Sequence, residues 1–170
     1  MNEVSDLNIG KKWYAVHTKS RHERQVALRL EGKHIETFLP VRALQRKWKD
    51  RKKMVEFPLF PGYIFVNVPL TEKKEVLQTV SVVRIVGVTQ PEPIPENQIF
   101  AIRKFLETQI NFDPYPYLVP GMEVEVKRGP LKHVRGVLVS KKNKHRLIVN
   151  IDLINNSVAT EIDAEDVQPV

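Results

Sequence analysis

The stretch over residues 57–68 constrains the fold of this chain more than any other. It places two prolines and Gly62 directly before an apolar run that begins at Tyr63. Proline has no backbone N–H to donate to a β-ladder and glycine tolerates positive φ, so we expect a turn that leads into a strand over 63–68. Side chains of a strand alternate between two faces, and here both are apolar. The pattern favours a central strand covered on both faces; the alternative is a strand that leaves one aromatic face open as a docking surface.

The segments around this strand predict an α+β domain. Ser20 and Glu23 form an S-x-x-E capping box, which predicts the start of a helix, and Gly32 is placed to end it. The expected elements, in order, are a strand over 12–18, that helix, strands over 35–48 and 54–59, the strand over 63–68, a short helix capped by Thr71, a strand over 82–88 and a helix from Pro95. Helices should therefore cover a largely antiparallel sheet.

A change of pattern marks a second domain. Residues 109–117 are rich in turn residues and show no period, so we expect a linker there. Short apolar strands at even spacing follow, over 124–126, 134–139, 147–153 and 158–162, which predicts a small all-β barrel. The boundaries that we expect are a flexible N-terminus over 1–10, a first domain over 11–108, the linker over 109–117 and a second domain over 118–170.

Composition limits the function classes. The 170 residues include no cysteine, which excludes disulfides and thiolate chemistry. The five histidines lack the H-x-x-x-H and H-E-x-x-H spacings, and there is no G-x-S-x-G elbow or Walker loop. We therefore predict that the chain is not an enzyme and needs no metal or cofactor. No apolar run approaches the roughly 20 residues that span a bilayer, so we expect a cytoplasmic protein without membrane association. We also expect a monomer.

Positive charge is concentrated in one part of the chain. The formal net charge is +7, and residues 46–53 carry six cations and one anion around Trp48. A charged hairpin tip is commonly only a solvated turn; the competing interpretation is phosphate contact, with Trp48 stacking on a base. The cations that we assign to nucleic-acid contact on charge are Arg24, Arg46, Lys47, Lys49 and Arg51. Residues 151–170 carry five acids and no lysine or arginine, which suits a protein partner better.

Several motifs resemble one known family. The run Trp-Tyr-Ala-Val-His-Thr over 13–18, Phe-Leu-Pro over 38–40 and Pro-Leu-Phe-Pro-Gly-Tyr-Ile-Phe-Val over 58–66 resemble the amino-terminal domain of the NusG family of transcription elongation factors. Residues 120–170, with Val-Glu-Val over 124–126 and Gly-Pro-Leu over 129–131, resemble the KOW module of the same family. The resemblance covers nearly the whole chain in the family's order. It implies an NGN-like antiparallel sheet covered by helices, followed by an SH3-like KOW barrel.

The resemblance also implies a function, that of an elongation or antitermination factor that suppresses pausing or termination. The first domain would bind the clamp helices of RNA polymerase beside the non-template DNA strand. The KOW domain would recruit ribosomal protein S10 or the termination factor Rho. The alternative is a ribosome-associated or RNA-binding KOW protein that does not bind polymerase.

The family's contact residues fall on specific positions of this sequence. Polymerase contacts fall on His17, Phe60, Pro61, Tyr63, Phe65, Lys73, Lys74, Ile99 and Ile102, non-template DNA contacts on Lys19, Arg21 and Arg29, and KOW partner contacts on Leu153, Ile154, Asn155 and Asn156. The two asparagines replace the glycine and arginine of general NusG. This replacement favours a specialised antiterminator of the RfaH, UpxY or LoaP kind.

In RfaH the second domain is stored as a helical hairpin that covers the polymerase site. Here the β-branched residues of the second domain favour strands, and Gly129-Pro130 would interrupt a long helix. Phe57 stands at the position of the acidic latch in RfaH, and Glu56 would point to the opposite strand face. We therefore predict a barrel from the start, on a mobile linker, with the aromatic patch unmasked.

Overall fold

The computed structural model describes residues 10–108, 110–115, 121–141 and 144–170. The chain divides into two compact units, Met1–Ile94 and Pro95–Val170. The boundary therefore falls before the last helix of the expected first domain. Residues 1–9 of the expected N-terminal segment, and 109, 116 and 117 of the expected linker, lie outside the described residues.

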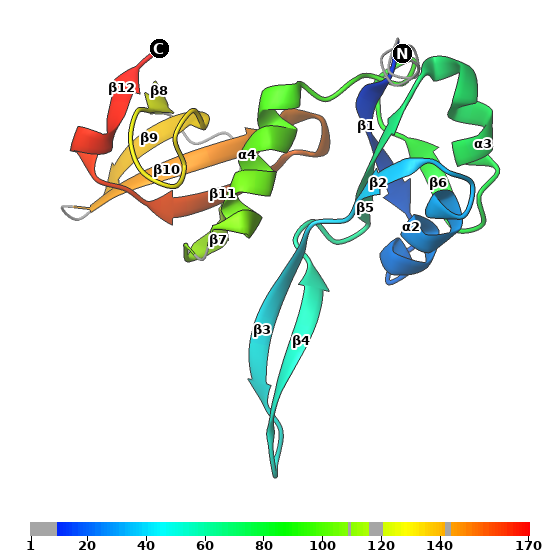
Figure 1. Cartoon of the computed structure of the whole chain (residues 1–170), viewed down its shortest axis with the longest axis horizontal. Helices are drawn as coiled ribbons and strands as arrows, with labels where there is room; N and C mark the ends of the chain where they lie inside the picture. Colours follow the sequence, from blue (N-terminus) through cyan, green and yellow to red (C-terminus); the bar gives the residue numbers. More distant parts are fainter. Residues whose placement is uncertain (1–9, 109, 116–120, 142–143) are drawn as a thin grey trace, which may run out of the picture. The chain divides into compact units, whose positions relative to one another are not determined.

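The first unit contains an antiparallel sheet in the order β2-β5-β1-β6 (Figure 1). Its strands are β1 (Lys12–Thr18), β2 (Glu36–Phe38), β5 (Tyr63–Val68) and β6 (Val82–Ile85). Helices α2 (Glu23–Glu31) and α3 (Lys73–Leu77) supply Val26, Leu30 and Val76 to one core cluster, in which Ile64 and Val66 of β5 are buried. The α+β prediction is confirmed for this unit.

Strand β5 is a central strand, because β1 and β2 pair with its two edges. On the face opposite the helix-facing residues, Phe65 is fully buried, with ring centroids 6.0 Å from Phe38 and 6.1 Å from Phe60. The interpretation of β5 as a central strand is confirmed. The alternative, an aromatic face left open for docking, is wrong for Phe65, which is buried, whereas Tyr63 on the same face is partly exposed.

The single strand expected over 35–48 is two strands. It breaks at Leu39 and Pro40 into β2 and β3 (Val41–Lys47), and β3 pairs with β4 (Lys52–Pro58). These two strands form a sheet of their own, and Figure 1 shows their hairpin projecting from the sheet that contains β5. At its base, the N–H of Leu59 donates to the carbonyl of Pro40 at 2.8 Å.

The predicted capping box does not form. The N-cap of α2 is His22, without a side-chain hydrogen bond to the helix, and Arg21 before it has φ of 63°. Glu23 instead accepts the N–H of Gly62 at 2.7 Å, so its carboxylate serves a distant turn. The helix does end at Gly32 as predicted. Thr71 lies within a 3₁₀ turn (Leu70–Glu72) that leads into α3, and not at its cap.

The second unit combines one helix with an antiparallel sheet in the order β12-β8-β9-β10-β11-β7. Its elements are α4 (Glu96–Glu107), β7 (Phe112–Tyr115), β8 (Met122–Val126), β9 (Arg135–Lys141), β10 (Lys144–Ile151), the 3₁₀ turn Asp152–Ile154, β11 (Asn156–Glu161), the 3₁₀ turn Ala164–Asp166 and β12 (Val167–Pro169). Helix α4 packs against β9 and β10. The prediction of an all-β segment after α4, without a helical hairpin, is confirmed among these residues.

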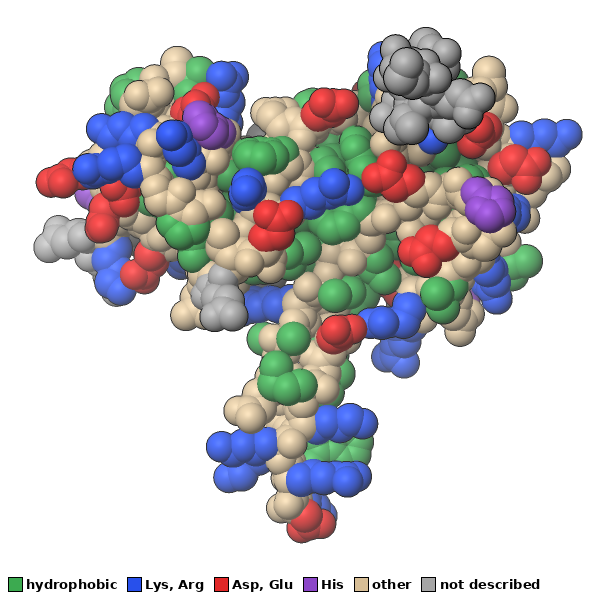
Figure 2. Space-filling model, in the orientation of Figure 1, with side chains coloured by type: hydrophobic (Ala, Val, Ile, Leu, Met, Phe, Trp, Pro, Cys, Tyr) green, Lys and Arg blue, Asp and Glu red, His purple; other side chains and the backbone are tan. Residues whose placement is uncertain are grey.

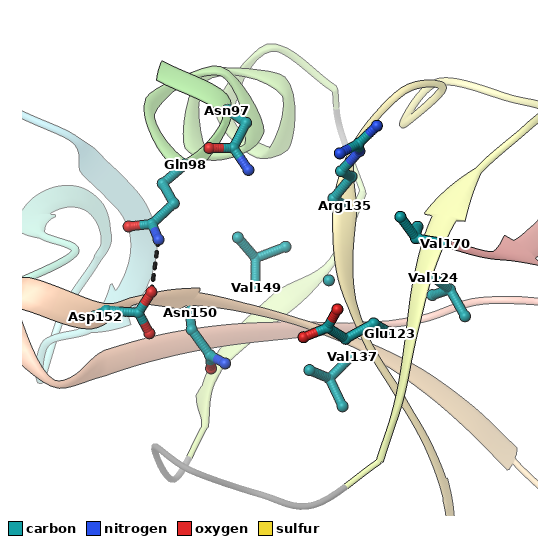
Figure 3. Close-up of a pocket in the computed structure, with 11 residues that line it drawn as sticks. Asn97, Gln98, Glu123, Val124, Arg135, Val137, Val149, Asn150, Asp152 and Val170 are labelled. Carbon is teal, nitrogen blue, oxygen red and sulfur yellow. Dashed lines mark hydrogen bonds between the residues drawn. The ribbon is translucent and has the colours of Figure 1, made fainter. Parts of the chain in front are cut away.

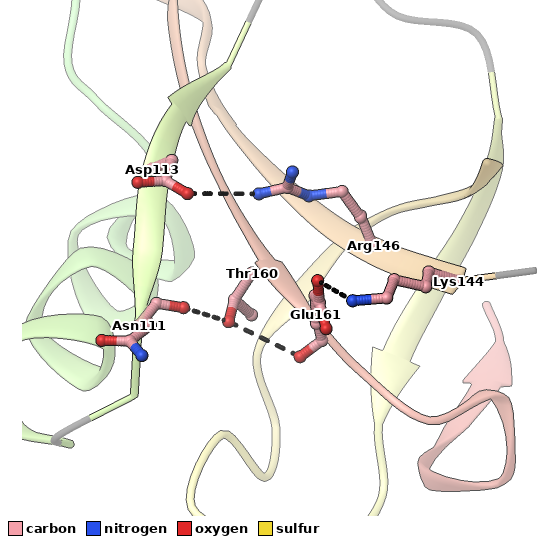
Figure 4. Close-up of polar contacts among 6 residues, drawn as sticks. All are labelled: Asn111, Asp113, Lys144, Arg146, Thr160 and Glu161. Atoms are coloured by element: carbon pink, nitrogen blue, oxygen red, sulfur yellow. Dashed lines mark hydrogen bonds and ion pairs between the residues drawn. The ribbon is translucent and has the colours of Figure 1, made fainter. Parts of the chain in front are cut away.

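The expected linker contains strand β7, which pairs with the edge of β11. Polar contacts hold it there: Thr160 Oγ1 donates to the carbonyl of Asn111 at 2.6 Å, and Arg146 lies 3.6 Å from Asp113 (Figure 4). Turn-rich sequence does not reveal this strand, because strand pairing depends on a partner far along the chain.

Candidate functional site

The turn before β5 is held by three hydrogen bonds. Gly62 has φ of +84°, a conformation that glycine adopts without strain. Its N–H donates to the carboxylate of Glu23, and its carbonyl accepts the N–H of Thr18 at 2.8 Å. The N–H of Tyr63 donates to the carbonyl of Phe60 at 3.1 Å. These bonds fix the turn, which exposes Pro61, against both α2 and β1.

Two rings of the predicted polymerase contact lie together beside this turn. His17 on β1 and Tyr63 on β5 are cross-strand partners, and their rings stack with centroids 5.2 Å apart and an interplanar angle of 28°. Both residues are partly exposed. They form the part of the predicted aromatic contact that solvent reaches.

The other apolar residues of that prediction are buried. Phe60 is 2% exposed and Phe65 is not exposed, and on α4 the exposed fractions are 3% for Ile99 and 0% for Ile102. Phe60 and Phe65 therefore do not belong to the exposed aromatic surface that we expected, and the assignment of the four residues to polymerase contact stays a prediction. Ile99 and Ile102 belong to the helix that packs on β9 and β10, whereas Phe60 and Phe65 contact each other in the first unit.

The cations predicted on and around α2 and α3 differ in their surroundings. Lys73 and Lys74 are exposed at the start of α3, and Lys19 and Arg21 are exposed ahead of α2. The two predicted arginines within α2 each have a partner in the first unit. Arg24 Nη2 lies 2.6 Å from Glu56 Oε2 on β4, and Arg29 Nη1 donates to the carbonyl of Val80 at 3.1 Å.

The β3–β4 hairpin carries the largest group of exposed cations in the first unit (Figure 2). Its register sets Arg46 opposite Lys53 and Lys47 opposite Lys52. Like charges directly opposite each other destabilise a strand pair. A bound anion would relieve this repulsion, so the arrangement suits contact with an anionic partner. Trp48 at the tip is 63% exposed. Lys49 and Arg51 flank the same tip and are also exposed.

In the second unit, the predicted partner contacts surround the turn after β10. Leu153 and Asn156 are partly exposed and Asn155 is exposed, whereas Ile154 is only 5% exposed, and its assignment to partner contact stays a prediction. Asn155 has φ of 50°, a conformation that asparagine tolerates better than most residues. The side chain of Asn156 donates to the carbonyl of Ile154 at 2.7 Å, which stabilises the turn.

A cavity of about 270 Å³ lies next to this turn within the second unit (Figure 3). Gln98 points from α4 toward Asp152, and its Nε2 donates to Asp152 Oδ2 at 2.7 Å. This bond connects α4 to the turn that carries Leu153. Sequence reasoning missed Gln98 and gave Glu23 a different partner, because each acts on a residue far along the chain.

Comparison with known proteins supports one class. In fold, the chain is similar to a solved structure described as "Domain interaction in Thermotoga maritima NusG", with a TM-score of 0.53, 22% identity, and coverage of 96% of this chain and 99% of that one. Among curated proteins, it is 27% identical to the transcription termination/antitermination protein NusG of Pseudomonas aeruginosa, over 95% of this chain and all of that protein. It is 28% identical to NusG of Staphylococcus aureus, over 93% of this chain and 95% of that protein.

These similarities define a transcription factor with an α+β part followed by an all-β part. The sequence model of one family, described as "Transcription termination factor nusG", matches residues 11–103. The chain belongs to the NusG family of transcription termination and antitermination factors. In the part of the chain that the structure describes, none of the helices has the length and apolar character needed to cross a membrane.

Proposed function

We propose that the chain binds RNA polymerase through its first unit and suppresses pausing or termination. The observation that carries this proposal is the partly exposed His17–Tyr63 ring pair, which the Glu23–Gly62 hydrogen bond holds beside exposed Pro61. Aromatic side chains contribute most to the binding energy of many protein interfaces. Rings that are already held in place lose little conformational entropy on binding. The clamp helices are the expected partner of this surface.

The factor acts by binding energy alone. A ligand shifts a conformational equilibrium only by its difference in affinity for the two states, so the chain must bind the elongating polymerase better than the paused one. Lys73 and Lys74 are assigned to a second polymerase contact. Ile99 and Ile102 are buried, so they contribute to polymerase binding only where the packing around α4 opens.

We assign the exposed cations to the non-template DNA strand and the second unit to a protein partner. Lys19, Arg21 and the β3–β4 hairpin supply phosphate contacts, and Trp48 supplies a ring for stacking. In the second unit, partly exposed Leu153 and exposed Asn155 are the contact for ribosomal protein S10 or Rho. We also propose that the factor is specialised for one or a few operons. Genome-wide occupancy tests this point, because a specialised factor occupies only those operons, whereas a general factor occupies nearly all transcribed genes.

The polymerase contact is tested with the variant His17→Ala/Tyr63→Ala. Affinity for a reconstituted elongation complex should fall about a hundredfold, because truncation of an interface hot spot costs about 2 kcal/mol or more. Phe100→Ala, which truncates an exposed ring on α4, is the control and should change affinity little. Unchanged affinity of the double variant, with the fold intact by circular dichroism, would remove the ring pair from the interface.

A further inference from the structure

The cavity beside the turn after β10 is lined by several elements of the second unit. Helix α4, strands β8, β9 and β10 and the 3₁₀ turn that begins at Asp152 all contribute residues to it. Its volume of about 270 Å³ is just below the range of about 300–1,000 Å³ that is usual for ligand pockets, so a ligand has to be small. Val137 and Val149 supply apolar surface, and Asn97 and Asn150 supply amide groups (Figure 3). This mixture of apolar surface and a few polar groups is typical of ligand pockets.

The charges that line this cavity are not balanced. Glu123 on β8 is exposed, and within the part of the chain that the structure describes its carboxylate has no hydrogen bond or ion pair. Arg135 also lines the cavity, but its Nε donates to Glu125 at 2.9 Å, and Figure 3 shows its guanidinium directed away from Glu123. Asp152 adds a second carboxylate. The cavity therefore presents more negative than positive charge to a ligand.

The two carboxylates stand on different sides of the cavity. Figure 3 shows Glu123 on one side and Asp152 on the other. Gln98 Nε2 donates to Asp152 Oδ2 at 2.7 Å and so holds that carboxylate in place, and one such bond uses only part of the acceptor capacity of a carboxylate. Among the described residues, no three or more His, Cys, Asp or Glu side chains are grouped to hold a metal ion. The arrangement therefore suits an organic cation that carries charge at both ends.

We propose that this cavity binds a short aliphatic diamine. One ammonium group pairs with Glu123 and the other with Asp152, while the methylene chain between them lies against Val137 and Val149. The methylene stem of a charged group packs well on apolar surface while its head stays with polar groups. A lysine side chain of a partner protein would bring only one charge, and the experiment distinguishes it from a diamine. This site does not depend on polymerase binding.

The wall that α4 contributes gives binding a structural consequence. Asn97 and Gln98 line the cavity from α4, and α4 packs against β9 and β10. A ligand that binds only when these walls are together stabilises that arrangement by mass action. Bound diamine should therefore hold α4 more firmly against the two strands.

Binding is tested by two-dimensional NMR of the full chain with putrescine, a four-carbon diamine. The buffer contains about 0.15 M KCl, where a Debye length of about 8 Å screens diffuse attraction. Putrescine should cause saturable shifts of the side-chain amides of Asn97 and Asn150. n-Butylamine has the same stem and one charge, so it should bind about fivefold more weakly for want of one exposed ion pair. Equal affinity for the two amines would overturn the proposal and favour a lysine side chain of a partner.

The two carboxylates are tested with Glu123→Gln and Asp152→Asn. Each removes one charge and should weaken putrescine binding about fivefold, and Asp152→Asn keeps an oxygen that accepts from Gln98. Glu165→Gln removes an exposed carboxylate that does not line the cavity, so it is the matched control with unchanged affinity. An equal loss in Glu165→Gln, or no loss in Glu123→Gln, would mean diffuse attraction to acidic surface and would overturn the site.

Hydrogen exchange of α4 is the second measurement. Saturating putrescine should slow exchange of the α4 amides, because the occupied cavity opposes opening of the helix. Unchanged exchange would place the diamine outside the cavity. If MgCl2 at the same concentration shifts the same side chains and slows α4 equally, the site accepts any cation and the diamine assignment fails. None of these measurements involves polymerase, so a failure of this site is distinct from a failure of the proposed function.

Discussion

The hairpins β3–β4 and β8–β9 place charge in opposite ways. In β8–β9, Glu125 lies opposite Arg135, whose Nε donates to the carboxylate at 2.9 Å. In β3–β4, Lys47 lies opposite Lys52, and a second like-charged pair precedes them. Opposite charges stabilise a cross-strand pair and like charges destabilise it. The β8–β9 hairpin therefore satisfies these charges internally, whereas β3–β4 leaves its cations for an external anion.

Their structural support differs as well. The β8–β9 hairpin belongs to a six-stranded sheet and buries Val124 and Val126, whereas β3 and β4 pair only with each other among the described strands. An isolated two-stranded hairpin is at best marginally stable in water. Contacts near its base support β3–β4, including the guanidinium of Arg46, which lies 4.7 Å from the ring centroid of Phe57. This difference indicates that the end of the β3–β4 hairpin serves binding more than stability.

The largest expected effect tests whether stability resides in the central sheet and not in the hairpin tip. Phe65→Ala should lower the free energy of unfolding by about 3–5 kcal/mol, because it removes a fully buried ring. Trp48→Ala at the exposed tip should change it by less than about 0.5 kcal/mol. Urea denaturation of the two variants makes the measurement. A comparable destabilisation by Trp48→Ala would show that the tip is a structural element.

A smaller effect is expected at the turn that joins the hairpin to the central strand. Glu23→Ala leaves the partly buried N–H of Gly62 without its acceptor and should cost about 1.5–3 kcal/mol, the range for a hydrogen bond to a charged group. Glu72→Ala, at an exposed carboxylate, is the control. Hydrogen exchange of the Gly62 amide provides a second measurement, since removal of the carboxylate should speed it. Equal exchange rates would mean that water replaces Glu23 without cost.

The turn and strand around Gly62 are predictable from sequence, because proline, glycine and alternation are local signals. The S-x-x-E motif is also local and assigns Glu23 to a capping box, but a backbone donor about forty residues away bonds its carboxylate. The sequence of strand β7 predicts a linker for the same reason, because its pairing partner β11 lies far along the chain. In each case a partner distant in sequence decides the structure, and a single sequence does not show that partner.

The candidate site is predictable in part. Register brings His17 and Tyr63 together, and alternation places them on one face of the sheet. The apolar pattern favours burial of Phe65, but it does not reveal that Tyr63 on the same face stays partly exposed. Charge marks the β3–β4 hairpin, but only its register shows that lysines oppose each other. The pairing of Arg24 with Glu56 likewise required the structure.

The contrast between the hairpins can be tested by giving one of them the charge pattern of the other. Lys52→Glu places an acid opposite Lys47 and should stabilise the chain by about 0.2–1 kcal/mol. The same change should weaken binding to single-stranded DNA and reduce the slope of log K against log salt by about 0.7 for each phosphate that is no longer neutralised. Arg135→Glu in β8–β9 is the mirror variant, with lower stability and an unchanged slope. Destabilisation by Lys52→Glu would contradict the role given to the like-charged pair.

The smallest expected effect is a pH dependence that belongs to β8–β9. Hydrogen bonds from Arg135 and then His133 hold the pKa of Glu125 below its ordinary value. A carboxyl whose pKa is lower in the folded chain contributes stability above its ordinary pKa of about 4.3, and this contribution disappears as the pH falls through the folded-state pKa. Stability should therefore decline on acidification, and Arg135→Gln should make that decline shallower. Urea denaturation at several pH values measures both curves. Parallel curves would show that the cross-strand pair, although well formed, contributes nothing that depends on the charge of Glu125.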